Sequence, residues 1–389
     1  MLMNKIITLF YVAAIFLLVA CESSESVDSE NGGVSIYLSL PPALSVDTRA
    51  GNIGAVTIND VWVVQFGADG KMLHAVCYGS AKISNLGDSG ALVQVETGNF
   101  SDVKGTFRII ANFGEVQSQL VAFSQKGDAT KADLDGIIIN YTNYKSQPNY
   151  LVSDELEFNG TDASGKAVLL AGLSYAYSWV DVKWTNKVTA PARFTLQSIT
   201  AYNLPTSFAI ESRAGTSSGA YPATSVVTGT YPVDAVDTTN PDPNGLSSNS
   251  TSTFYMPENL RGVGCGKSFQ EKNLNAYGPK ADGTAPVLGS DGKPEAGGDL
   301  SKCTYIDLIG SYWYSYDGDN PTGTSPISVR YRLYLGGNLV NDYNVRRGYH
   351  YTITVQISGA NSADVRVTIT NGNVVVFDKV EEINKVVDF

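Results

Sequence analysis

Apolar and polar residues alternate along many short runs of this chain, and the alternation restricts its fold more than any other feature. Val180, Val182 and Trp184 fall on one side of an extended segment, and Asp181 and Lys183 fall on the other. A period of two predicts β-strands that bury one face and expose the other. We predict such strands at residues 34–40, 61–66, 106–111, 180–184, 194–201, 329–335, 350–357 and 365–369.

Helical periodicity is scarce by comparison. The best candidate is the segment 115–126, in which Val116, Leu120 and Phe123 share one face. Because strands do not alternate regularly with helices, a parallel sheet is not expected. Turn-forming pairs such as Asp69-Gly70 separate the predicted strands. The sequence therefore predicts an all-β chain built from antiparallel β-sandwiches.

The length of 389 residues exceeds what one hydrophobic core usually serves, so we predict two sandwich domains. Their junction is placed near Gly172. Two long segments rich in Gly, Ser, Asp and Pro, 215–253 and 264–302, lack periodicity and are expected to be surface insertions of the second domain. The predicted organisation is 1–20 as a signal peptide, 21–49 as an acidic tether with a removable first strand, 50–172 as the N-terminal domain and 173–389 as the C-terminal domain.

The first residues are typical of an exported lipoprotein. Lys5 is followed by an apolar run that ends in Leu18-Val19-Ala20-Cys21, the pattern of a lipobox. This run is too short to cross a bilayer core of about 30 Å as a permanent helix. We expect cleavage before Cys21, acylation of that cysteine and retention on a membrane. The polar, acidic segment 22–33 would then serve as a flexible tether.

Three cysteines remain once Cys21 carries lipid. A disulfide between Cys265 and Cys303 would close a long loop, which is worth about 3–4 kcal/mol in the chain-entropy model. Free thiols or a different pairing are the alternative. Cys77 stands in a strand-like run and is expected to be a buried thiol. No CxxC spacing indicates a metal site.

Enzymatic and nucleic-acid-binding functions receive little support. The only histidines are His74 and His350, and each stands in or beside a predicted strand. The chain has no nucleophile elbow, Walker loop, zinc-protease motif or dinucleotide-binding glycine pattern. The acidic segment 317–320 is expected to be a plain turn, and no cofactor is expected. A net charge of −11 without a basic cluster argues against nucleic acid as a partner.

Several motifs in fixed order resemble the fimbrillins, subunits of the type V pili of Bacteroides and Porphyromonas relatives. They are the lipobox at Cys21, Thr48-Arg49-Ala50 after the first strand, Phe254-Tyr255-Met256-Pro257-Glu258-Asn259-Leu260-Arg261-Gly262, Cys303-Thr304-Tyr305-Ile306-Asp307-Leu308 and Tyr343-Asn344-Val345-Arg346-Arg347-Gly348-Tyr349-His350-Tyr351. The resemblance spans nearly all of the chain. It implies two transthyretin-like β-sandwich domains and display on the outer membrane. The residues themselves also fit a simpler interpretation, in which segment 344–348 is a polar turn that sets the register of the following strand.

The resemblance also implies a mechanism of assembly. Proteolysis between Arg49 and Ala50 would remove the lipid together with the first strand, and the groove left behind would accept a strand of another subunit. The apolar segment 374–389 is the candidate donor. We thus expect a structural and adhesive surface protein whose partners are other fimbrial subunits and surface glycans or proteins. The alternatives are a lipid-anchored accessory adhesin or pilus anchor that does not polymerise, and a glycan-binding surface lipoprotein with a platform formed by Tyr312, Trp313, Tyr314 and Tyr316.

Overall fold

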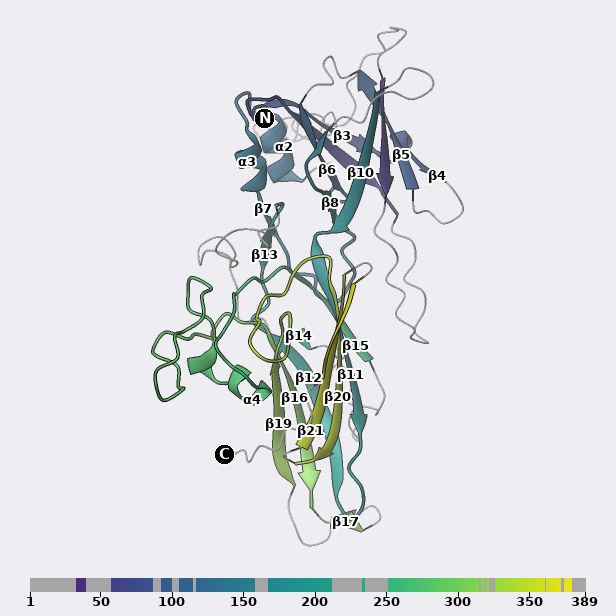
Figure 1. The fold of residues 1–389 in the computed structure, drawn as a ribbon. Coiled ribbons are helices and arrows are strands. Elements are labelled where there is room, and N and C mark those ends of the chain that lie inside the picture. Colours follow the sequence, from purple (N-terminus) through teal and green to yellow (C-terminus); the bar gives the residue numbers. More distant parts are fainter. Residues whose placement is uncertain are drawn as a thin grey trace, which may run out of the picture. The chain divides into compact units, whose positions relative to one another are not determined.

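A computed structural model shows that the described part of the chain is built mainly from β-strands (Figure 1). The described residues are 33–39, 57–86, 92–99, 105–114, 117–157, 167–211, 233–234, 251–314, 316–317, 320–321, 326–360, 362–371 and 374–379. The chain divides into two compact units: residues 1–139 with 149–176, and residues 140–148 with 177–389. No helix in the described ranges is both long and apolar enough to cross a membrane.

Unit 1 contains one extended sheet. Its hydrogen-bonded order is β3-β2-β6-β8-β10-β1-β5-β4, and β9 pairs with β6. The bounds are β1 (Gly33–Ser39), β2 (Asp60–Phe66), β3 (Met72–Gly79), β4 (Ile83–Leu86), β5 (Leu92–Asn99), β6 (Thr106–Ala111), β8 (Leu151–Ser153), β9 (Leu156–Glu157) and β10 (Ala167–Tyr175). The short elements η1 (Ser80–Lys82) and β7 (Ile138–Asn140) complete this part of the chain.

The core of unit 1 centres on β2, in which all seven residues are buried. Helix α2 (Ser118–Ser124) covers part of this core with Leu120 and Phe123, and the Phe123 ring lies edge-on to Phe66 at 6.4 Å between centroids. Helix α3 (Lys131–Asp135) begins with a capping box in which Thr130 and Asp133 satisfy each other's backbone N–H groups. The helix predicted over 115–126 is therefore present as α2.

Unit 2 has two main sheets, ordered β15-β11-β20-β21-β22 and β14-β12-β16-β19. Trp184 of β11 contacts Phe194 of β12 at 6.2 Å between ring centroids, so the sheets pack face to face around a shared core. The bounds are β11 (Tyr177–Asn186), β12 (Arg193–Tyr202), β13 (Ser207–Ala209), β14 (Val233–Asp234), β15 (Thr251–Pro257), α4 (Phe269–Lys272), η2 (Asn275–Tyr277), β16 (Tyr305–Trp313), β17 (Tyr316–Asp317), β18 (Asn320–Pro321), β19 (Ile327–Tyr334), β20 (His350–Gly359), β21 (Ser362–Asn371) and β22 (Val374–Lys379).

The prediction of an all-β chain is confirmed, whereas the transthyretin-like detail stays a prediction. Two strand pairs differ from the antiparallel expectation, since β1 runs parallel to β10 and β11 runs parallel to β20. Each parallel pair joins strands that are far apart in the sequence, so the connection is long enough to return to the same end of the sheet. Local patterns carry no information about such long-range pairing.

Asp-Gly turns recur with one geometry. In Asp69-Gly70, Asp282-Gly283 and Asp291-Gly292 the aspartate Oδ1 accepts the backbone N–H of the residue two positions later. Each glycine has a positive φ, between 74° and 82°, which glycine adopts without strain. Two of the three turns lie within the predicted insertion 264–302, which also contains α4 and η2, so that segment is ordered by its own local hydrogen bonds.

Candidate functional site

The first strand lies inside the sheet of unit 1, between β10 and β5 (Figure 1). It pairs in parallel with β10 from Val34 opposite Ala167 to Ser39 opposite Gly172, and it pairs antiparallel with β5 on its other side. Ile36 and Leu38 are fully buried, while Tyr37 between them is half-buried. Both the backbone and the apolar side chains of β1 are thus part of the sheet and its core.

Removal of β1 would expose two strands at once. The facing backbone groups of β10 and β5 would lose their partners, and the positions filled by Ile36 and Leu38 would open. Unpaired backbone groups beside an apolar groove are the features that favour addition of an extended segment from another chain. Cys21, Arg49 and Ala50 lie outside the described residues.

The last described strand, β22, lies at the end of its sheet. It pairs antiparallel with β21, from Arg366 opposite Lys379 to Asn371 opposite Val374. Within the described strands, β21 is its one neighbour. The remainder of the predicted donor, residues 380–389, lies outside the described residues.

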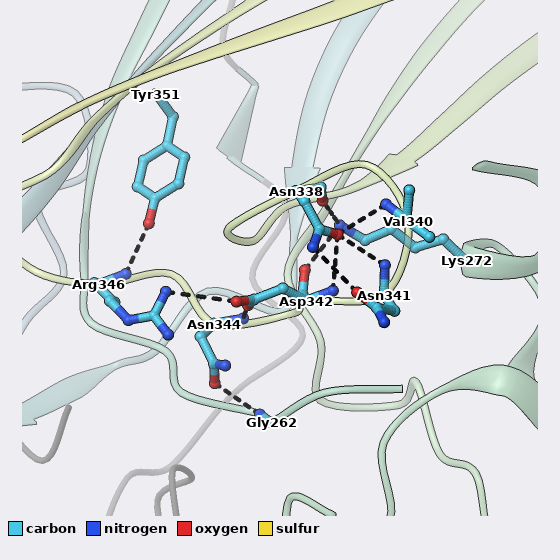
Figure 2. Close-up of polar contacts among 9 residues, drawn as sticks. All are labelled: Gly262, Lys272, Asn338, Val340, Asn341, Asp342, Asn344, Arg346 and Tyr351. Atoms are coloured by element: carbon cyan, nitrogen blue, oxygen red, sulfur yellow. Dashed lines mark hydrogen bonds and ion pairs between the residues drawn. The ribbon is translucent and has the colours of Figure 1, made fainter. Parts of the chain in front are cut away.

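A partly buried polar network organises the loop that leads from β19 to β20 (Figure 2). The Asn338 side-chain oxygen accepts the backbone N–H groups of Val340, Asn341 and Asp342 at 2.8, 2.8 and 3.0 Å. The Lys272 ammonium donates to the backbone oxygen of Asn338 and, at 2.9 Å, to that of Asp342. Lys272 is only 1% exposed, and α4 therefore places a buried cation among the loop's carbonyl groups.

The same loop is tied to residue 262 and to the next strand. Asp342 Oδ1 accepts the Asn344 N–H at 2.7 Å, and Asn344 Oδ1 accepts the Gly262 N–H at 2.7 Å. The Arg346 N–H donates to the Tyr351 hydroxyl at 2.9 Å, inside β20 (Figure 2). The Gly262 hydrogen bond fastens the chain just before the 264–302 insertion to the loop before β20.

The remaining motif residues make further internal contacts. Asn259 exchanges backbone hydrogen bonds with Val345, and its side-chain amide donates to Thr304 Oγ1 at 2.8 Å. The Arg347 guanidinium donates to the carbonyl groups of Ala209 and Ile210, both at 2.7 Å. The sequence pointed to a polar turn at 344–348, but the carbonyl groups of Ala209 and Ile210 that accept from Arg347 carry no sequence signal.

His350 and Asp181 form a buried pair in the sheet of β11 and β20. His350 Nε2 lies 3.0 Å from Asp181 Oδ2, and the Trp179 ring stacks on His350 at 4.5 Å. Burial alone would raise the pKa of Asp181, but hydrogen bonds from His350, Thr253 and Trp179 lower it below its usual value. Among the residues that the structure describes, no group of three or more His, Cys, Asp or Glu side chains is placed to hold a metal ion.

Cys265 and Cys303 are free thiols in the structure. Cys303 is buried, and burial raises the pKa of its thiol to about 12. Burial also raises the pKa of the partly exposed Cys265. The predicted disulfide between Cys265 and Cys303 is not shown and stays a prediction, while Cys77 is buried as expected.

Comparison with protein families finds a match to a domain of unknown function, DUF4906, over residues 254–355. This range contains the insertion and the polar network, and it covers a minor part of the chain. Comparison with curated protein sequences finds no match.

Several solved structures are similar to the chain over most of its length. One is described as a candidate cell adhesion protein of Bacteroides eggerthii, at 13% identity and TM-score 0.48, covering 92% of this chain and 100% of that one. Two are from Porphyromonas gingivalis. The tip fimbrial protein Mfa3 with C-terminal truncation has 12% identity and TM-score 0.47, covering 87% of this chain and 99% of that one. A fimbrilin, fimA, has 11% identity and TM-score 0.45, covering 84% of this chain and 90% of that one. Identities and TM-scores at this level are too low to transfer a function.

Proposed function

We propose that this protein is an adhesive fimbrial subunit of the bacterial surface, held by lipid on Cys21 and assembled by strand exchange. The position of β1 carries the proposal, because a segment preceding Arg49 in the sequence fills the space between β10 and β5. A single cut after Arg49 would separate that strand covalently from the rest of unit 1. The lipoprotein signal and the ordered motifs of the sequence support surface display.

The donor strand is expected to come from the segment 374–389. Val374, Val375, Val376 and Phe377 belong to β22, and the segment continues with Ile383, Val386, Val387 and Phe389. Burying four large side chains in a neighbour's groove would contribute a gross gain of about 6–12 kcal/mol, reduced substantially by the cost of ordering the tail. We propose that the gain left after this cost holds the polymer together.

Proteolytic activation is the direct test. The secreted chain from Glu22 is incubated with a trace of trypsin, beside an Arg49→Ala variant and a version that lacks residues 380–389. We expect the cut wild-type chain to form a ladder of oligomers on a mildly denaturing gel, because only it has both an open groove and a donor. Monomers from the cut wild type, or equal ladders from all three proteins, would contradict strand exchange.

Lipid attachment gives a second prediction. Replacement of Cys21 by serine removes the thiol that is acylated, so metabolic labelling with a fatty acid and retention on the cell surface should both be lost. Inhibition of lipoprotein signal peptidase should leave the signal peptide attached to the wild-type chain. A Cys21→Ser protein that stays membrane-bound with its signal peptide removed would contradict the lipoprotein assignment.

A non-polymerising anchor or accessory adhesin is the second candidate. It is favoured by β22, which already pairs with β21 in its own sheet and so is not a free donor. In that case the segment before Ala50 stays attached and β1 stays in its place. N-terminal sequencing of the protein on intact cells separates the candidates, since a subunit begins at Ala50 and an anchor begins at the acylated Cys21.

A further inference from the structure

The strands β4 and β5 are joined to the sheet of unit 1 through β1. Among the strands that the structure describes, β5 pairs with β1 and β4, and β4 pairs with β5 alone. β10 has β1 as its partner over residues 167–172, and its pairing with β8 begins at Leu173. The β4–β5 pair, defined as residues 83–86 and 92–99, therefore loses its described strand connection to β10 when β1 leaves.

The strand directions allow β5 to take the place of β1 beside β10. β1 runs parallel to β10 and antiparallel to β5, so β5 and β10 run in opposite directions and can form an ordinary antiparallel pair. Tyr37 is in register with Leu170 on one side and with Gln94 on the other. Because residues at the same level of a sheet share a face, a sideways shift by one strand restores pairing without inverting either strand.

The connection between β3 and β4 is long enough for this shift. It is η1, a 3-10 turn of three residues, Ser80–Lys82, none of which is buried. Unwinding such a turn from about 2.0 to about 3.3 Å per residue lengthens it by about 4 Å. One strand spacing is about 4.8 Å, so a small adjustment of the flanking residues supplies the remainder.

We propose that the β4–β5 pair is a movable side of the groove: when β1 leaves, the pair shifts onto β10 and closes the groove until an incoming strand displaces it. This proposal rests on the strand exchange proposed above and adds its regulation. Closure pairs the exposed backbone groups of both strands, which protects a processed subunit from nonspecific strand addition. The closed state leaves no place for the fully buried Ile36 and Leu38, so a strand that supplies two such side chains is favoured over it.

An engineered disulfide distinguishes the two positions of β5. The test pair is Gln94→Cys with Leu170→Cys, the positions on either side of Tyr37. With β1 in place their Cα atoms are two strand spacings apart, about 9–10 Å, which exceeds the limit of about 7 Å for a disulfide. After closure they are neighbours at about 5 Å. The matched control, Tyr37→Cys with Leu170→Cys, joins positions that are neighbours only while β1 is in place.

Two routes free the groove of β1 in the lipid-free chain from Glu22. One is the trypsin cut after Arg49 followed by gel filtration at a concentration too low for ladders. The other needs no proteolysis and uses the uncut chain with Ile36→Ser and Leu38→Ser. After mild oxidation with diamide, peptide mapping separates the engineered link from disulfides of the native cysteines. Gln94→Cys with Val168→Cys or with Gly172→Cys covers closure displaced by two residues, the smallest slip that keeps the faces matched.

We expect the test pair to link at least about tenfold faster after either route than in the otherwise unchanged uncut chain. An excess of a peptide of residues 33–40 should return the rate to that of the uncut chain, because it displaces β5 from β10. The control pair should link in the uncut chain. Hydrogen exchange of the cut chain without added cysteines is the second measurement, and the amides of 167–172 should stay within about tenfold of their protection in the uncut chain.

An open groove would overturn the proposal. It would appear as no link after either route, together with rapid exchange of 167–172 while β2 stays protected. Rapid linking in the uncut chain would overturn it too, because β5 would then reach β10 without release of β1. Loss of protection in β2 would show that unit 1 unfolds instead of closing. A cut chain that keeps its β1 fragment through gel filtration contradicts strand exchange itself, and the serine variant then still decides whether the β4–β5 pair closes.

Discussion

A synthetic peptide with the sequence of residues 33–40 should block ladder formation by the trypsin-cut chain, whereas a peptide with serine at positions 36 and 38 should not. The peptide reproduces β1, which pairs with both β10 and β5 and buries Ile36 and Leu38 completely. It therefore competes with a donor strand for the same groove. Its backbone groups satisfy both exposed strands, as in other strand-addition complexes.

The expected loss of peptide affinity follows from the burial of Ile36 and Leu38. Each fully buried aliphatic side chain contributes about 1.5–3 kcal/mol, so loss of both is worth about 3–6 kcal/mol. The serine peptide should bind roughly a hundredfold more weakly or worse. Tyr37 is half-buried and points to the opposite face, so a peptide with serine at 37 should lose less than about tenfold.

Fluorescence anisotropy of labelled peptides on the cut chain measures these affinities, and gels of the same samples report ladder formation. The uncut chain is the control, since its groove is filled by its own β1. If the serine peptide at 36 and 38 competes as well as the native one, the buried side chains do not define the groove. If no peptide binds the cut chain, β1 does not leave after cleavage.

Strands with strong alternation could be predicted closely from the sequence. The prediction 106–111 coincides with β6, and 350–357 lies within β20 (His350–Gly359). β3 was indicated only as a strand-like run around Cys77, without bounds, because its pattern is irregular: Leu73 and Val76 are exposed, Cys77 is buried, and the register shifts where β3 pairs with Phe66. A bulge breaks the period of two on which the prediction depends.

At the candidate sites, too, local sequence patterns predict the elements but not their long-range partners. The sequence indicates that residues 34–40 form a strand, but its place between β10 and β5 depends on pairing across more than a hundred residues of chain. Helix α3 has a local signal, the Thr130 to Asp133 capping box, and was missed because the helix is short. Lys272 and Asn338 have no such signal, because their roles exist only once the insertion folds back on the loop.

The second large effect is expected at Gly336, the residue that opens the loop containing Asn338. Its φ is +148°, and a Cβ placed there would lie 1.8 Å from the backbone oxygen of Asp342. Neither that oxygen nor the adjacent chain can move without disturbing the hydrogen bonds of Asp342 to Lys272 and Asn344. Gly336→Ala should therefore destabilise unit 2.

The expected cost combines about 1–3 kcal/mol from overpacking and about 1–3 kcal/mol from the strained backbone. Gly292→Ala is the matched control, because Gly292 also has a positive φ of +74° but no atom lies within 4 Å of the added Cβ. It should show the backbone strain alone. Differential scanning calorimetry gives the stabilities, and hydrogen exchange of residues 264–302 and 336–348 localises the change.

The two units separate this effect from assembly. Gly336 and the polar network belong to unit 2, whereas the groove between β10 and β5 that holds β1 belongs to unit 1. Gly336→Ala should thus increase hydrogen exchange in the insertion and leave the affinity of the cut chain for the β1 peptide unchanged. If Gly336→Ala and Gly292→Ala were equally stable, the contact with Asp342 would not constrain the loop. A change in peptide affinity would instead show that the network in unit 2 controls the groove in unit 1.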